Sequence, residues 1–154
     1  MNYELFMGEA LAEGRLALDR GMRPSAAVAV VNDAMVARAH DRVQDSNDPT
    51  AHAVIVALRE AGRKLGGTQF GDITVFTTLE PCAMCVGALL ASNVTELVYA
   101  IPDPHEGAAG TVIQLAQHAA LPRRMLVVSG IRRDDAEELF ASAGVAVATG
   151  LPPG

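Results

Sequence analysis

The sequence predicts one α/β domain with a partly antiparallel sheet of about five strands and about five helices. Helical and extended segments alternate along the 154 residues, without a linker or a low-complexity segment. A chain of this length removes roughly two thirds of its unfolded surface from water, so its core needs no disulfide. We therefore treat residues 1–154 as a single domain, and we leave open whether the tail from 145 to 154 is peripheral.

The first elements are a helix and a β-hairpin. Residues 3–19 carry apolar side chains at helical spacing and precede Gly21, which predicts a first helix. Two apolar segments, 26–31 and 35–39, flank the pair Asn32-Asp33, which is typical of a tight hairpin turn. The sheet is therefore expected to be antiparallel at this point.

The middle of the chain is expected to hold a helix, a strand and a second helix. Asp48-Pro49-Thr50 follows a polar loop and offers a capping side chain and then a proline, which predicts a helix from about 50 to 61. Residues 73–78 are β-branched and aromatic, as in a buried strand. Glu80-Pro81 then begins a helix that should extend to about residue 91.

The last third is expected to alternate between strands and helices. Residues 97–101 and 125–129 have the composition of strands, and residues 112–119 form a short apolar segment that we assign to a helix. Acidic residues begin the segment 134–142 and Gly144 follows it, which predicts a final helix.

Composition and charge argue against membrane and nucleic-acid binding as default functions. Half of the residues are apolar, yet no apolar run approaches the ~20 residues that span a bilayer. The first four residues do not resemble a secretory signal, so we expect a soluble, cytoplasmic protein. A net charge of −6 gives no global attraction to phosphate backbones.

Three side chains stand out as candidate zinc ligands. Cys82 and Cys85 are three residues apart at the start of one predicted helix, and His52 lies in the first turn of another. Two thiolates and one imidazole suit zinc and leave a fourth tetrahedral position for water, as in catalytic sites. A thioredoxin-like redox pair, two core cysteines and a surface histidine are the alternatives that the residues leave open.

The sequence around these residues resembles the cytidine and tRNA-adenosine deaminase superfamily. The segments Asp48-Pro49-Thr50-Ala51-His52-Ala53 and Thr78-Leu79-Glu80-Pro81-Cys82-Ala83-Met84-Cys85 are similar to its two zinc motifs. The similarity extends from Pro24 to about Phe140 and is strongest to bacterial tRNA adenosine deaminases and nucleobase deaminases. The resemblance implies a three-layer α/β/α cytidine deaminase-like fold, one zinc ion bound by His52, Cys82 and Cys85, and a homodimer.

The chain departs from this family at the residue that transfers protons. The family's first motif reads His-x-Glu, whereas this chain has Val54 at the glutamate position, and valine has no proton to give or take. General acid–base catalysis is typically worth about 10²–10⁴ in rate, so the family mechanism predicts a very poor deaminase. Asp41 replaces a usual asparagine at the substrate, and Ala26 replaces a usual glycine beside the pocket.

Four explanations of Val54 remain open. The chain is a zinc-bearing non-catalytic subunit or pseudoenzyme, similar to the valine-bearing partner in the eukaryotic tRNA adenosine deaminase. Alternatively, an active hydrolase recruits another acid, for which Asp41 is the first candidate, with Asp103 and Glu106 after it. In the third explanation, the fold catalyses a different reaction on a nucleobase-like or other nitrogen heterocycle. In the fourth, an experimenter replaced the glutamate.

Our prediction is a zinc-dependent aminohydrolase for a small amino-substituted nucleobase, nucleoside or related heterocycle. The resemblance implies that the Leu79 carbonyl and the Cys82 N–H contact the substrate, and we expect Ala26, Asp41, Asp103 and His105 around it. Glu80 is expected to be a structural acceptor. The tail lacks the basic helix of the tRNA-acting relatives, so tRNA is disfavoured as the substrate.

Overall fold

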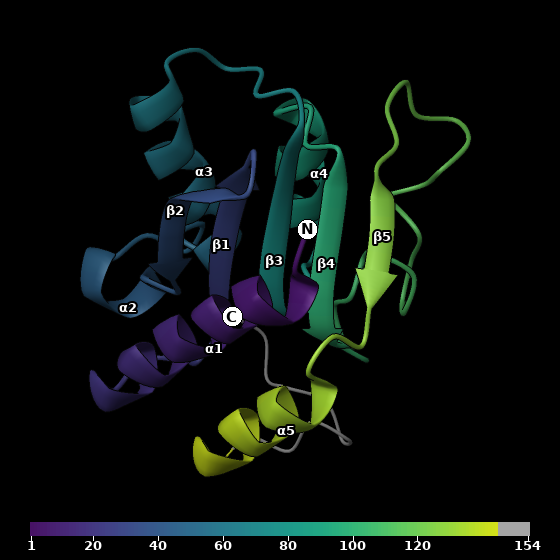
Figure 1. Cartoon of the computed structure of the whole chain (residues 1–154). Helices are drawn as coiled ribbons and strands as arrows, with labels where there is room; N and C mark the ends of the chain where they lie inside the picture. The colour runs from purple at the N-terminus through teal and green to yellow at the C-terminus, as the bar shows by residue number, and fades with distance from the viewer. Residues whose placement is uncertain (145–154) are drawn as a thin grey trace.

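The computed structural model describes residues 1–144 and has helices on both faces of one mixed five-stranded sheet (Figure 1). The strands are β1 (Ala26–Val31), β2 (Ala34–His40), β3 (Ile73–Leu79), β4 (Glu96–Ile101) and β5 (Leu126–Ser129). The helices are α1 (Tyr3–Asp19), α2 (Val43–Ser46), α3 (Ala53–Leu65), α4 (Ala83–Ala91) and α5 (Arg133–Ser142). The predicted α/β fold with a partly antiparallel sheet is therefore confirmed, and the behaviour of the tail beyond 144 lies outside the described residues.

The sheet has the strand order β2-β1-β3-β4-β5. β1 pairs antiparallel with both β2 and β3, whereas β3, β4 and β5 are mutually parallel. Asn32 and Asp33 form the predicted hairpin turn, and both have positive φ angles, 51° and 59°, as a tight turn between twisted strands requires.

Two hydrophobic clusters fill the space on the two faces of the sheet. One face packs against α3 and α4 through residues such as Val75, Val86 and Leu97, and the other packs against α1 and α5 through residues such as Phe76 and Leu139. The alternation of side chains along each strand supplies both clusters, since neighbouring residues point to opposite faces. The result is the three-layer arrangement that the sequence predicted.

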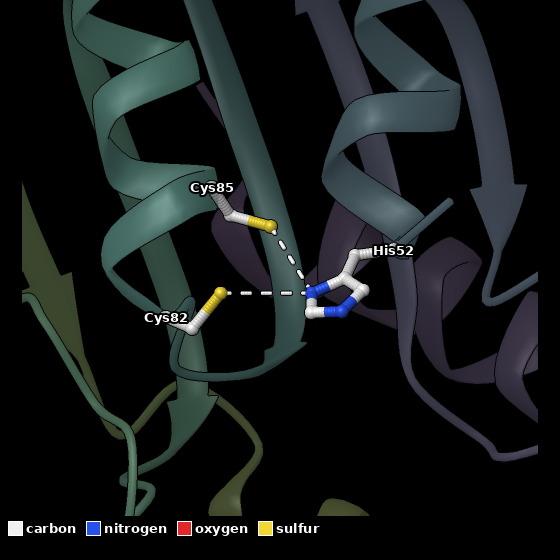
Figure 2. Close-up of side chains that lie close together, drawn as sticks. All are labelled: His52, Cys82 and Cys85. Atoms are coloured by element: carbon white, nitrogen blue, oxygen red, sulfur yellow. Dashed lines mark hydrogen bonds between the residues drawn. The ribbon is translucent and has the colours of Figure 1, made fainter. Parts of the chain in front are cut away.

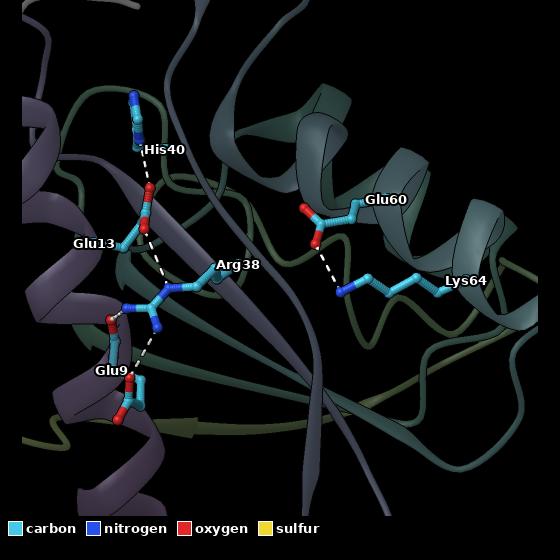
Figure 3. Close-up of polar contacts among 6 residues, drawn as sticks. All are labelled: Glu9, Glu13, Arg38, His40, Glu60 and Lys64. Atoms are coloured by element: carbon cyan, nitrogen blue, oxygen red, sulfur yellow. Dashed lines mark hydrogen bonds and ion pairs between the residues drawn. The ribbon is translucent and has the colours of Figure 1, made fainter.

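A polar cluster ties α1 to the edge strand β2 (Figure 3). Glu13 accepts hydrogen bonds from the Arg38 Nε atom, at 3.2 Å, and contacts the His40 Nδ1 atom at 2.5 Å. The same guanidinium group bonds the Glu9 carboxylate at 3.1 Å. His40 is only 3% exposed, so its bond to Glu13 compensates part of the cost of burying its ring.

The prediction of a helix over residues 112–119 is wrong. The backbone N–H groups of Val112 and Ile113 both donate to the Gly107 carbonyl, and that of Leu115 donates to the Ala108 carbonyl. These bonds reach back across a loop instead of to the residue four positions before, as an α-helix requires. Apolar spacing over eight residues was too short a signal to distinguish helix from a packed loop.

Candidate metal centre and cleft

The candidate metal ligands come from the N-terminal ends of two neighbouring helices. His52 is the residue immediately before α3, and Cys82 is the residue immediately before α4, while Cys85 lies in the first turn of α4. α3 begins slightly later than predicted because the Asp48 carboxylate bonds the Thr50 N–H, at 2.9 Å, and closes a separate turn ahead of it. α4 also begins slightly later than predicted, at Ala83. The two helix ends place partial positive charge beside the three ligands, which favours thiolate.

The three side chains meet in one place (Figure 2). The His52 Nδ1 atom lies 3.5 Å from the Cys82 sulfur and 3.5 Å from the Cys85 sulfur. The three ligand atoms all lie within 4.8 Å of one another. A tetrahedral zinc ion with usual bond lengths would hold a nitrogen and a sulfur about 3.6 Å apart, so the observed spacing fits zinc closely. His52, Cys82 and Cys85 are therefore placed to bind one metal ion.

The ionisation of the three ligand groups agrees with this proximity. The pKa of Cys82 is lowered to about 4, mainly because the Cys85 thiol donates to its sulfur, with the His52 ring as a second donor. The same hydrogen bond, together with burial, raises the pKa of Cys85. The pKa of His52 is raised, first by its bond to the Cys82 thiolate. One negative charge is thus already stabilised where a cation would bind.

A cleft opens beside the metal ligands at the carboxyl end of β3. Its lining includes the three ligands and the following predicted site residues: Ala26, Asp41, Val54, Leu79, Asp103 and Glu106. The cleft is also lined by residues that the sequence did not single out: Arg23, Ser25, Ala53, Thr77 and Pro81. His105 is exposed and is not among the lining residues, so its role at the substrate stays a prediction.

The carboxylates of the cleft differ in their surroundings. Asp41 is 6% exposed and follows β2, and its Oδ1 atom accepts a hydrogen bond from the Val43 N–H at 2.9 Å. Asp103 is also 6% exposed, and its Oδ1 accepts from the N–H groups of His105 and Glu106. Glu106 is exposed. The charges of Asp41 and Glu106 each contribute to raising the pKa of His52 and of Cys85, so both act electrostatically on the metal site.

Glu80 is one of the residues that line the cleft, and its carboxylate holds the loop that follows β4. Its carboxylate accepts hydrogen bonds from the backbone N–H groups of Asp103 (3.1 Å), Ala109 (2.9 Å) and Thr111 (3.2 Å), and from the Thr111 hydroxyl (2.5 Å). The side chain is 1% exposed. It is therefore occupied as a structural acceptor.

Val54 lies two residues after His52, in the first turn of α3, and is 4% exposed. Its two methyl groups belong to the cluster that packs α3 and α4 on the sheet, and the residue also lines the cleft. The cleft wall at this position is therefore apolar.

Comparison with known proteins shows the relationship of the chain. Residues 1–101 match the cytidine and deoxycytidylate deaminase zinc-binding region. The chain is 36% identical over 132 residues to the tRNA-specific adenosine deaminase of Bacillus subtilis, covering 86% of this chain and 82% of that protein. A structure from a study of tRNA:A34 deaminases has a TM-score of 0.83 at 33% identity, covering 87% of this chain and 97% of that one. The guanine deaminase from Nitrosomonas europaea has a TM-score of 0.77 at 28% identity, covering 91% and 83%.

Proposed function

Because this chain belongs to the cytidine and deoxycytidylate deaminase zinc-binding family, we propose that it is a zinc-dependent aminohydrolase for a small amino-substituted nucleobase, nucleoside or related heterocycle. The observation that carries the proposal is the set His52, Cys82 and Cys85 at the wall of a cleft, because three protein ligands leave one tetrahedral position free. A bound zinc ion would supply an activated water for attack on the ring carbon that carries the amino group.

The side chains around the cleft fit a planar heterocycle with an exocyclic amine. Ala26 and Leu79 offer apolar surface to a ring, and the Leu79 carbonyl is an acceptor for an N–H group. The carboxylates of Asp41 and Asp103 are further acceptors, while the Cys82 N–H at the start of α4 is a donor. These acceptors favour a substrate with several N–H groups.

The proton transfers must come from a residue other than Val54, and we assign them to Asp41. One oxygen of the Asp41 carboxylate is held by the Val43 N–H, which fixes the orientation of the group. The second oxygen remains for a proton, and the carboxylate acts on the charges of His52 and Cys85. Glu106 has the same electrostatic reach, but it is exposed, so its carboxylate is less well positioned for the role.

Substitution of Asp41 by asparagine should lower the rate of ammonia release by about tenfold or more, since asparagine keeps the shape but cannot transfer the proton. The assay compares the zinc-loaded native chain and the variant on guanine, adenine, cytosine, their nucleosides and a tRNA, at equal zinc content. Asp45→Asn is the control, because Asp45 is exposed on the same segment and pairs only with Arg42 in the described residues.

Two results would contradict these assignments. An Asp41→Asn chain that works as fast as the native chain removes Asp41 from the proton transfer. A native chain that releases no ammonia from any of these substrates contradicts the aminohydrolase proposal and favours a catalytically silent subunit. Val54 favours the catalytically silent subunit, because it places methyl groups where the family mechanism needs a carboxylate.

A small substrate is favoured over tRNA by the charges around the cleft. The lining carries Asp41, Asp103 and Glu106 beside Arg23, and the whole chain has a net charge of −6. Because tRNA affinity depends on neutralising phosphates, this balance opposes it. The relatives in Bacillus subtilis and in Nitrosomonas europaea are described as a tRNA-specific adenosine deaminase and a guanine deaminase, so the assay includes both substrate classes.

We further propose that the chain forms a homodimer through the apolar surface next to the metal site. Val112 and Ile113 are 51% and 48% exposed on the loop whose Ala108 N–H donates to the Pro81 carbonyl, just ahead of α4. Met84, in the first turn of α4, is 38% exposed. Sedimentation of the native chain should give a dimer, and Ile113→Glu should shift it toward monomer by placing a charge in the contact. Leu5→Glu, at an exposed leucine of α1, is the control. A native monomer at micromolar concentration would contradict the proposal.

No helix among the described residues is long and apolar enough to cross a bilayer.

A further inference from the structure

Three threonines lie on β3, and one of them is buried without a hydrogen-bond partner. The Thr74 hydroxyl donates to the Glu96 carboxylate at 3.2 Å. The Thr78 hydroxyl donates to the Pro24 carbonyl at 3.2 Å and accepts from the Ala26 N–H at 3.1 Å. The Thr77 hydroxyl makes no hydrogen bond to any group in the described residues, although the side chain is only 2% exposed. Buried hydroxyls are normally bonded, so this exception needs an explanation.

The position of Thr77 on β3 explains why its hydroxyl has no partner. Side chains alternate along a strand, so Thr77 points to the same face as Ile73 and Val75, toward α3 and α4. It stands in register between Ala27 of β1 and Tyr99 of β4. The residue lines the cleft together with the metal ligands and Val54. Thr77 therefore belongs to the floor of the cleft, and its hydroxyl is a covered polar group next to that space, without a partner among the described residues.

The other buried side-chain atom without a partner in the described residues is the His40 Nε2 atom. His40 contacts Glu13 of α1 and is not among the residues that line the cleft. Thr77 thus differs from it in facing a space that a ligand is proposed to enter. Rotation about the Cα–Cβ bond moves the hydroxyl from one staggered position to another, so the hydroxyl can turn toward a bound ring.

We infer that Thr77 is a specificity-determining residue that hydrogen-bonds a ring nitrogen or exocyclic group of the heterocycle bound in the cleft. The inference rests on the proposed function, which it deepens by naming the residue of the sheet that reads the base. Val54 of α3 offers the cleft no polar group where the family has a glutamate. The Thr77 hydroxyl on β3 can therefore provide a polar contact on that inner wall.

The test compares Thr77→Val, which replaces the hydroxyl by a methyl group of similar shape, with Thr77→Ser, which keeps it. Binding of 8-azaguanine, 2,6-diaminopurine and cytosine to the zinc-loaded full chain is measured by calorimetry, and stability by thermal unfolding. Thr77→Val should keep its zinc and an equal or higher unfolding midpoint, but bind the preferred base about tenfold more weakly. Thr77→Ser should bind within a few-fold of the native chain.

Thr78→Val is the matched control, because its hydroxyl is partnered and its loss should lower the unfolding midpoint. Native affinity in Thr77→Val would overturn the inference while leaving the proposed function intact. A clear drop in its midpoint, as in Thr78→Val, would also overturn it, since the hydroxyl would then be structural. A native chain that binds none of the bases would contradict the proposed function, and the role of Thr77 with it.

Discussion

Ammonia release is expected to rise by about 10²-fold or more when Val54 is replaced by glutamate, because the variant has a carboxylate for proton transfer beside the metal site. Val54 lies two residues after His52 in the first turn of α3 and lines the cleft, so a glutamate at this position is attached to the same cleft wall as the metal ligand His52. The partial positive charge at the start of α3 favours a carboxylate at this position. The measurement is the rate of ammonia release at equal zinc content.

Val54→Gln is the control for this experiment, because glutamine has the size of glutamate and cannot exchange a proton at neutral pH. The Val54→Gln variant should release ammonia at the native rate. If the glutamate variant is no faster than the glutamine variant, and both keep their fold and zinc, proton transfer is not what the cleft lacks. Activity that appears only in the glutamate variant would instead identify the native chain as a silent member of its family.

The sequence predicted the metal centre well because its ligands lie in short motifs at helix starts. His52 and Cys82 each immediately precede a helix, and Cys85 lies in the first turn of α4, so short stretches of sequence hold all three ligands. The hairpin at Asn32-Asp33 was predictable for a similar reason, since the turn depends on two adjacent residues that tolerate positive φ.

The cleft could be predicted only in part, because it is assembled from strand ends that are distant in the sequence. Asp41 and Asp103 follow β2 and β4, and only the sheet order brings them to the same edge as the ligands. Thr77 was missed because threonine is common in strands, and its missing partner is visible only once the neighbours are placed. Residues 112–119 were assigned to a helix from their apolar spacing, because the long-range hydrogen bonds of this loop leave no signal in the sequence.

That same loop makes Glu80 the residue whose loss should cost the most stability among those near the cleft. Glu80→Ala is expected to lower the free energy of unfolding by about 3–4 kcal/mol, because the buried N–H groups of Asp103 and Ala109 lose their acceptor. Thr111 is exposed, so water can replace the acceptor there at little cost. Urea unfolding of the zinc-loaded chain measures the loss.

Glu80→Gln should lose about half as much, since an amide keeps one acceptor oxygen and turns an NH2 group toward backbone donors. Glu138→Ala, at an exposed glutamate of α5, is the control and should change stability by less than about 0.5 kcal/mol.

The loop after β4 also packs closely against the Glu80 side chain, because a Cβ atom at Gly107 would lie 2.5 Å from the Glu80 carboxyl carbon. Because the loop that Glu80 holds carries Asp103 and Glu106, Glu80→Ala should also weaken substrate binding while the three metal ligands keep their ion. A variant that unfolds like the native chain would show that the loop is held by its own backbone bonds.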